Sequence, residues 1–175
     1  MKHLTLANNL TISRIILVPV YIISVIAGNE WLSISIFIFC ILTDFLDGLF
    51  ARIRGERTQL GSFLDPLADK LLLISSFIVL VVLKKIPVWV LIVVITKNII
   101  VFTGWWLRYH IMRNAEISPT LFGKTSTVLE MTVVLLVLIN TPENILNPIM
   151  YLMLLSIVIS TFTYIIPGIK EIEKK

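Results

Sequence analysis

Long apolar segments are the feature that most constrains how this chain can fold. Six of them follow one another along 175 residues, separated by short polar stretches. A helix needs about 20 mainly apolar residues to cross the hydrocarbon core of a bilayer. A soluble domain carries about 25% charged residues, whereas this chain carries 15% and has a mean hydropathy of +0.96. The sequence therefore predicts an all-α, polytopic membrane protein with six transmembrane helices.

Proline, glycine and charged residues mark the limits of these segments. The expected spans cover about 12–27, 31–53, 65–83, 88–112, 122–139 and 149–166. Residues 1–11 are polar enough for a short N-terminal interfacial segment that is retained in the protein. Asp65-Pro66 is expected to open the third span, because proline is tolerated in the first turn of a helix. Without any internal repeat, residues 1–175 are predicted to form a single transmembrane domain.

Lysine and arginine are distributed unequally between the two ends of the spans. Of fifteen, twelve lie on the side that carries both termini, Lys84 and Lys85 lie on the other, and Lys97 is mid-span. Because cytoplasmic loops are enriched in these residues, we expect an integral protein of the cytoplasmic (inner) membrane with both termini in the cytoplasm. The cations form no stripe, so the net charge of +4 does not indicate nucleic-acid binding. Cys40, the only cysteine, is expected to be a buried, inert thiol.

All four aspartates of the chain lie between the second and third spans. Asp44 and Asp47 are three residues apart, and Asp65 and Asp69 are four apart. Such spacings place each pair on one helical face, and the short link lets both pairs converge on the cytoplasmic side. Each carboxylate costs roughly 2.5–3.5 kcal/mol at a bilayer centre, so the four need compensation. With no histidine or cysteine nearby, they form a hard oxygen site suited to Mg²⁺ or Mn²⁺.

Small and basic residues accompany the aspartates. Small residues let a ligand approach the backbone, and arginine suits phosphate through bidentate bonds. These residues are Gly48, Ala51, Gly61 and Ser62, with Arg52, Arg54 and Arg57. Each feature alone has a structural explanation in capping, helix packing or membrane topology. Together they predict a site for a metal-bridged diphosphate.

The pattern D-x2-D-G-x2-A-R-x8-G-x3-D-x3-D resembles the signature of the CDP-alcohol phosphotransferases. Every fixed position matches: Asp44, Asp47, Gly48, Ala51, Arg52, Gly61, Asp65 and Asp69. The resemblance implies that the four aspartates bind two divalent cations, with Asp69 also acting as the general base. It implies that the CDP-lipid contacts Gly48, Arg52, Thr58, Gly61 and Ser62, and that the protein is a homodimer of phospholipid biosynthesis.

The acceptor is indicated by other segments. NNLTISRIILVPV and FLDPLADKLLL resemble the phosphatidylglycerophosphate synthase branch, which joins glycerol 3-phosphate to CDP-diacylglycerol. Asn9, Thr11 and Arg14 would line the cytoplasmic edge of the first span, either as ligands or as a helix cap and an interfacial anchor. Cations for the acceptor phosphate are available at Lys124, within PTLFGKTST, and at Arg108 and Arg113. The two arginines alternatively serve only to set membrane topology.

One departure keeps the acceptor open. The synthase branch is expected to carry an Arg-acid pair where this chain has Lys97-Asn98. Lys97 either substitutes for that arginine or, as we favour, pairs with Glu130 in the fifth span. Cardiolipin synthesis with phosphatidylglycerol as acceptor, or transfer to another alcohol, remain alternatives. A cation transporter is disfavoured because all four aspartates lie at one end of the spans, and a structural subunit because it does not explain their convergence.

Overall fold

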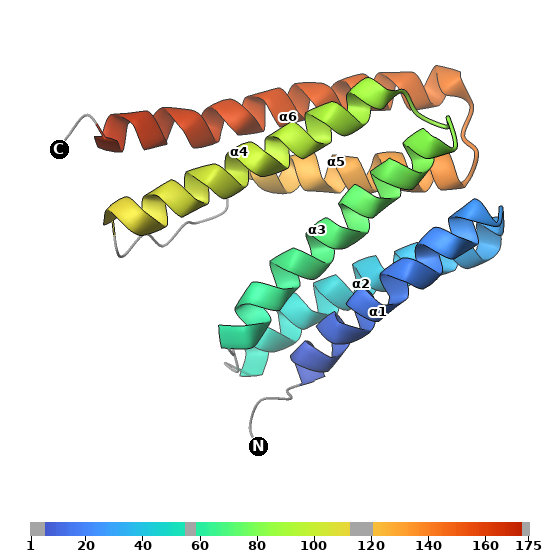
Figure 1. The fold of residues 1–175 in the computed structure, drawn as a ribbon, viewed down its shortest axis with the longest axis horizontal. Coiled ribbons are helices and arrows are strands. Elements are labelled where there is room, and N and C mark those ends of the chain that lie inside the picture. The colour runs from blue at the N-terminus through green and yellow to red at the C-terminus, as the bar shows by residue number, and fades with distance from the viewer. Residues whose placement is uncertain (1–5, 55–58, 113–120, 173–175) are drawn as a thin grey trace. The chain divides into compact units, whose positions relative to one another are not determined.

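The chain is all-helical wherever its computed structural model describes it (Figure 1). The backbone is described at residues 6–54, 59–112 and 121–172, and the side chains at 11–44, 46, 67–103 and 122–163. The helices are α1 (Leu6–Ile26), α2 (Glu30–Arg54), α3 (Gln59–Val82), α4 (Val88–Met112), α5 (Leu121–Leu138) and α6 (Glu143–Ile172). They form two compact units, Met1–Lys85 and Ile86–Lys175, with three helices in each.

In the first unit, α1 packs against both α2 and α3. The buried residues of α1 recur three and four positions apart, which places them on one helical face. They are Thr11, Arg14, Val18, Tyr21, Ser24 and Val25. Toward α2, the ring of Tyr21 lies 5.7 Å from that of Phe37 between centroids. The first unit is therefore built around one face of α1.

In the second unit, α6 packs against both α4 and α5. Its buried residues also recur at alternating spacings of four and three, and they are Leu146, Met150, Met153, Ile157 and Ser160. Near the start of α4, the ring of Trp89 stacks on that of Tyr151 with centroids 6.4 Å apart. In each unit, therefore, one helix supplies the surface against which the other two pack.

Three helices end with the same C-terminal capping motif. Gly28, Lys84 and Asn140 have left-handed φ angles of 70°, 58° and 52°. At the first of these ends, Gly28 N–H donates to Val25 O at 3.1 Å and Asn29 N–H donates to Ser24 O at 3.0 Å. These two bonds define a Schellman motif, which satisfies the last carbonyls of a helix. The same pair of bonds closes α3 and α5.

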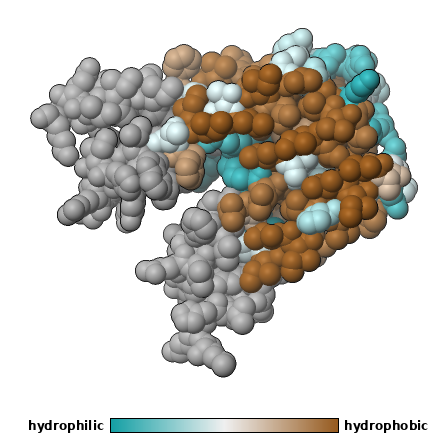
Figure 2. Space-filling view, in the orientation of Figure 1, coloured by the Kyte–Doolittle hydropathy of each residue, from teal (hydrophilic) through white to brown (hydrophobic). Residues whose placement is uncertain are grey.

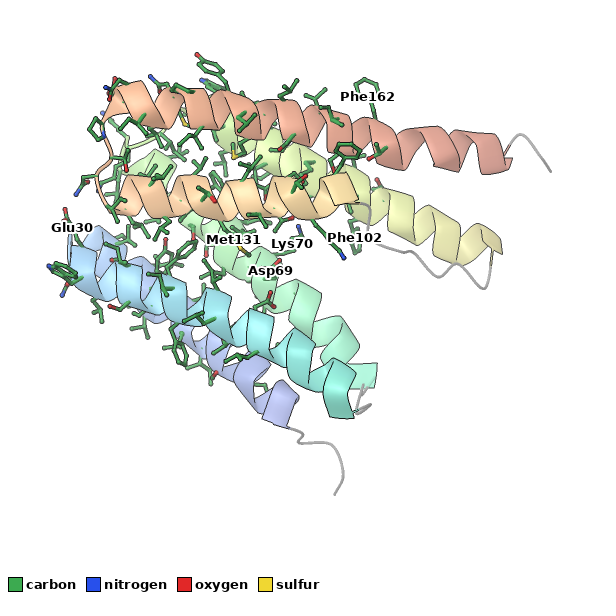
Figure 3. The ribbon with its side chains drawn as sticks, turned by 180° about the vertical axis from the view of Figure 1, so that it is seen from behind. Glu30, Asp69, Lys70, Phe102, Met131 and Phe162 are labelled. Atoms are coloured by element: carbon green, nitrogen blue, oxygen red, sulfur yellow. The ribbon has the colours of Figure 1, made fainter. Side chains whose placement is uncertain are left out.

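Apolar side chains cover much of the described surface (Figure 2). Phe102 of α4 and Phe162 of α6, both labelled in Figure 3, are exposed examples. Within the described residues, one helical stretch, Glu143–Thr163, is long and apolar enough to cross a membrane. Thr11–Ile26 and Val88–Thr103 are shorter apolar stretches. These surfaces are what a chain buried in hydrocarbon needs, because lipid tails solvate apolar side chains.

The helix boundaries correct three expectations from the sequence. The first helix begins at Leu6, so half of the expected interfacial segment belongs to α1. The third begins at Gln59, which leaves Pro66 inside α3 rather than in its first turn. The sixth covers Glu143–Ile172 and includes both Pro148 and Pro167, which were expected to lie outside it. Proline removes one backbone hydrogen bond, and neighbouring turns maintain these long helices despite that loss.

Candidate functional site

The hairpin of α2 and α3 brings the two aspartate pairs to matching heights. Asp44 lies ten residues before the end of α2, and Asp69 lies ten residues after the start of α3. Asp47 and Asp65 lie seven and six residues from the same helix ends. At a rise of 1.5 Å per residue, Asp44 and Asp69 each lie about 15 Å along their helices from the connection, and Asp47 and Asp65 each lie about 10 Å from it.

Asp44 is held by an arginine from another helix. Arg14 Nη1 donates to Asp44 Oδ1 at 2.5 Å, joining α1 to α2. The two side chains differ in environment, since Arg14 is 2% exposed and Asp44 is 41% exposed. Arg14 is therefore not the interfacial anchor that one interpretation of the sequence allowed. Its charge is enclosed among the helices of the first unit and is compensated there by Asp44.

Asp69 lies on α3 between buried and exposed positions. It directly follows Ala68, which is buried, and it is itself half-buried (Figure 3). One turn later, Leu72 and Leu73 belong to the apolar core of the first unit. Asp69 therefore lies between the apolar core of the first unit and the first turns of α3, which carry Asp65.

Most of the other predicted ligands lie outside the described side chains. The backbones of Asp47, Gly48 and Arg52 belong to α2, those of Gly61, Ser62 and Asp65 to α3, and that of Arg108 to α4. Thr58 and Arg113 lie outside the described residues altogether, and Asn9 belongs to α1 by its backbone. Lys124 is described, and its side chain is exposed in the first turn of α5.

Lys97 and Glu130 form an ion pair in which both side chains are buried. Lys97 Nζ donates to Glu130 Oε1 at 2.6 Å, and the two side chains are 3% and 0% exposed. The pair joins α4 to α5 within the second unit. This confirms the predicted pairing of Lys97 with Glu130. The next residue, Asn98, donates from Nδ2 to the carbonyl oxygen of Val94 in its own helix at 2.9 Å.

The donor set suits a hard divalent cation. Of the four aspartates, Asp44 and Asp69 have described side chains. Among all the described side chains, no three His, Cys, Asp or Glu residues lie close enough together to hold a metal ion. Arg14 engages Oδ1 of Asp44, and the part of this carboxylate that remains exposed is open to a further partner. Carboxylate oxygens are the ligands that Mg²⁺ and Mn²⁺ prefer. The described part of the site therefore fits such an ion.

The comparison with protein families covers nearly the whole chain. Residues 4–163 match the family model described as CDP-alcohol phosphatidyltransferase. The chain belongs to the CDP-alcohol phosphatidyltransferase family. All four aspartates, Arg14 and the Lys97–Glu130 pair lie within the matched residues, so the resemblance inferred from the signature is confirmed.

Relatives in this family carry two kinds of name. A Mycobacterium tuberculosis protein named "Probable phosphatidylglycerophosphate synthase" is 35% identical over 131 residues, which are 71% of this chain and 61% of that protein. An Aquifex aeolicus protein named "CDP-diacylglycerol--glycerol-3-phosphate 3-phosphatidyltransferase" is 28% identical over 96% of this chain and 98% of its own length. A Drosophila melanogaster protein named "Probable cardiolipin synthase (CMP-forming)" is 34% identical over 79% of this chain and 44% of its own length.

The contact between Arg14 and Asp44 was missed when the family signature was interpreted from sequence alone. A signal for it was nevertheless present. Counting back from Tyr21 and Val18 by alternating steps of three and four reaches Arg14 and then Thr11, and all four share the buried face of α1. An arginine on an otherwise apolar face needs an acidic partner, and the second helix offers Asp44 at the appropriate end.

Proposed function

We propose that this protein transfers a phosphatidyl group from CDP-diacylglycerol to glycerol 3-phosphate, giving phosphatidylglycerophosphate and CMP in phospholipid biosynthesis. The observation that carries the proposal is the family match over residues 4–163, which contains the complete aspartate signature. Relatives named for this activity, which include the Aquifex aeolicus protein aligned along nearly its whole length, favour glycerol 3-phosphate as the acceptor.

The proposed reaction is a substitution at the lipid-side phosphorus of CDP-diacylglycerol. Asp69 takes the proton from the acceptor hydroxyl, whose oxygen forms a new bond to that phosphorus. The bond between this phosphorus and the bridging oxygen breaks, and CMP leaves with the electron pair. Gly48, Arg52, Thr58, Gly61 and Ser62 are the residues that we assign to binding of the CDP-lipid. Lys124, Arg108 and Arg113 are assigned to the acceptor phosphate.

Asp44, Asp47, Asp65 and Asp69 are the residues that would hold two divalent cations, Mg²⁺ or Mn²⁺. Bound there, such ions would neutralise the diphosphate and stabilise the departing CMP. The chemistry of four carboxylates without a histidine or cysteine among them supports these ions over Zn²⁺. In the absence of metal, Arg14 beside Asp44 relieves part of the repulsion among the acids.

The proposed setting is the cytoplasmic membrane, with all six helices spanning it as one domain and the aspartates on the cytoplasmic side. The apolar exposed side chains and the distribution of lysine and arginine support this arrangement. We further propose that the protein functions as a homodimer among membrane lipids. This proposal rests on resemblance to the family.

The test is CMP release by the purified protein, supplied with CDP-diacylglycerol and Mg²⁺ or Mn²⁺, across a panel of acceptors. We expect release with glycerol 3-phosphate and none with phosphatidylglycerol. Relatives named as cardiolipin synthases make phosphatidylglycerol the specific competitor. Release with phosphatidylglycerol alone would leave the family and the aspartates in place but replace the proposed acceptor.

A further inference from the structure

Arg14 is a buried cation that contacts Asp44, an aspartate of the signature. It reaches Asp44 from α1, a helix that carries none of the signature residues. We propose that Arg14 is a positioning residue, which fixes the carboxylate of Asp44 so that its second oxygen is presented to a divalent cation. This inference rests on the proposed function, because it assumes that Asp44 is a metal ligand.

The unequal burial of the pair supports a positioning role. The guanidinium of Arg14 is enclosed on the buried face of α1, with Val18 one turn further along the same face. A side chain surrounded in this way has few conformations available. The side chain of Asp44 is instead 41% exposed, so it remains accessible to a further partner. The buried side chain of Arg14 can therefore set the orientation of the exposed carboxylate of Asp44.

The chemistry of the two groups supports the same assignment. Arg14 donates a charge-assisted hydrogen bond to the carboxylate of Asp44, which fixes the position of the oxygen that accepts it. Nη1 of Arg14 occupies Oδ1, and a carboxylate has a second oxygen with its own lone pairs. Groups that hydrogen-bond to metal ligands orient them, and their loss typically weakens metal binding by 10–100-fold.

Two other roles for Arg14 make different predictions. If Arg14 only neutralised charge, its removal would leave the aspartates more negative and strengthen cation binding. If Arg14 only held α1 against α2, its removal would resemble loss of another polar contact between these helices. Such a contact exists, since Ser24 Oγ of α1 lies 2.9 Å from Ser33 Oγ of α2. The direction of the change in cation affinity therefore separates positioning from charge neutralisation, and the comparison with loss of the Ser24–Ser33 contact separates it from helix packing.

The experiment measures Mn²⁺ binding to the full-length protein in detergent, from the electron paramagnetic resonance signal of free Mn²⁺. Arg14→Met keeps an elongated side chain in the buried site but removes the donors. We expect its Kd for Mn²⁺ to rise about 10–100-fold, with Ser24→Ala within about twofold of the unmodified protein. An unchanged or lower Kd in Arg14→Met overturns the inference, as does an equal rise in Ser24→Ala.

Arg14→Lys supplies a second test if Arg14→Met does not fold. Lysine retains the charge but replaces the planar donors with a single ammonium group, so we expect a smaller rise in Kd, of several-fold. A Kd equal to that of the unmodified protein in Arg14→Lys would overturn the inference in that case.

CMP release separates failure of the inference about Arg14 from failure of the proposed function. If the unmodified protein binds Mn²⁺ and releases CMP while both arginine variants bind Mn²⁺ normally, only the inference about Arg14 fails. Absence of Mn²⁺ binding in the unmodified protein overturns both the inference and the proposed metal site.

Discussion

Replacing Asp69 by asparagine removes the proposed base but keeps one oxygen that can still face the proposed cations. The amide has nearly the same volume as the carboxylate but cannot accept the proton of an acceptor hydroxyl at neutral pH. A general base contributes typically 10²–10⁴-fold to a rate. We expect Asp69→Asn to lower CMP release by at least about 100-fold while binding of CDP-diacylglycerol stays within several-fold.

The control for this change is Ser75→Ala on the same helix. The hydroxyl of Ser75 donates to the carbonyl oxygen of Leu72 in its own helix, so it has no assigned part in the reaction. Both variants are compared for CMP release and for binding of radiolabelled CDP-diacylglycerol. Turnover at the unmodified rate in Asp69→Asn would remove Asp69 as the base.

The pair Lys97–Glu130 leads to a prediction about stability. Removing one member of a buried ion pair leaves the other charge uncompensated and costs about 3–5 kcal/mol, whereas replacing both by apolar residues is often neutral or stabilising. Because both side chains are almost fully enclosed, we expect Lys97→Met to lower the unfolding temperature strongly. The double variant Lys97→Met with Glu130→Leu should recover most of that loss in thermal unfolding measured in detergent. Equal instability of the single and double variants would contradict this account.

For individual residues, the ion pair Lys97–Glu130 in the second unit could be predicted from the sequence, but the ion pair Arg14–Asp44 in the first unit was not. Lys97 and Glu130 are each conspicuous because they are ionised residues in the middle of apolar segments. Arg14 lies closer to the end of its segment, where membrane topology alone could explain it. Its burial depends on how α1 packs against two other helices, and that information is not local to its neighbours in sequence.

The limits of the helices were predicted well where proline lies outside the helix, as Pro87 does before α4, and less well where a proline inside the helix was interpreted as its boundary. Val88–Met112 has the limits expected from the sequence. The start of α3 was placed too late because Pro66 was interpreted as a first-turn residue, and α6 was made too short because Pro148 and Pro167 were interpreted as boundaries. Proline costs about 3 kcal/mol in a helix interior. Long apolar helices tolerate that cost when packing and the lack of competing water bonds favour the helical state.

Helix ends that use a left-handed residue give a prediction for the connections. A Cβ at Gly28 would meet nothing within 4 Å, so only its φ of 70° opposes a larger residue. We expect Gly28→Ala to destabilise the protein by about 1–2 kcal/mol, the cost of a left-handed conformation in an L-residue. Gly28→Asn should cost less, because asparagine is better tolerated there. Thermal unfolding of the two variants checks this order, and equal stability of Gly28→Ala and the unmodified protein would contradict it.

For the whole molecule, the two compact units divide the assigned residues. All four aspartates belong to the first unit, and the three candidates for binding the acceptor phosphate belong to the second. The signature and the family could be recognised from sequence because they depend on short fixed spacings. The division into units depends on which helix packs against which, and hydrophobic periodicity alone does not contain that information.

The proposed membrane topology can be tested with single cysteines, because Cys40 is the only native one. In a Cys40→Ala background, Lys85→Cys places a thiol at an exposed position between α3 and α4, and Glu143→Cys places one at the exposed first residue of α6. The proposed topology puts both positions outside the cytoplasm. Both should react with a membrane-impermeant maleimide in intact cells, whereas Glu171→Cys should react only after lysis. Labelling of Glu171→Cys in intact cells would reverse the proposed orientation.

The packing of α2 and α3 on α1 also has a consequence for biogenesis. A ribosome completes α1 before either of the helices that pack on it, and chains generally fold from the N-terminal side during synthesis. The surface that receives the aspartate hairpin has therefore already been synthesised when the hairpin emerges. The compact unit of residues 1–85 can form around α1 while the last three helices are still being translated.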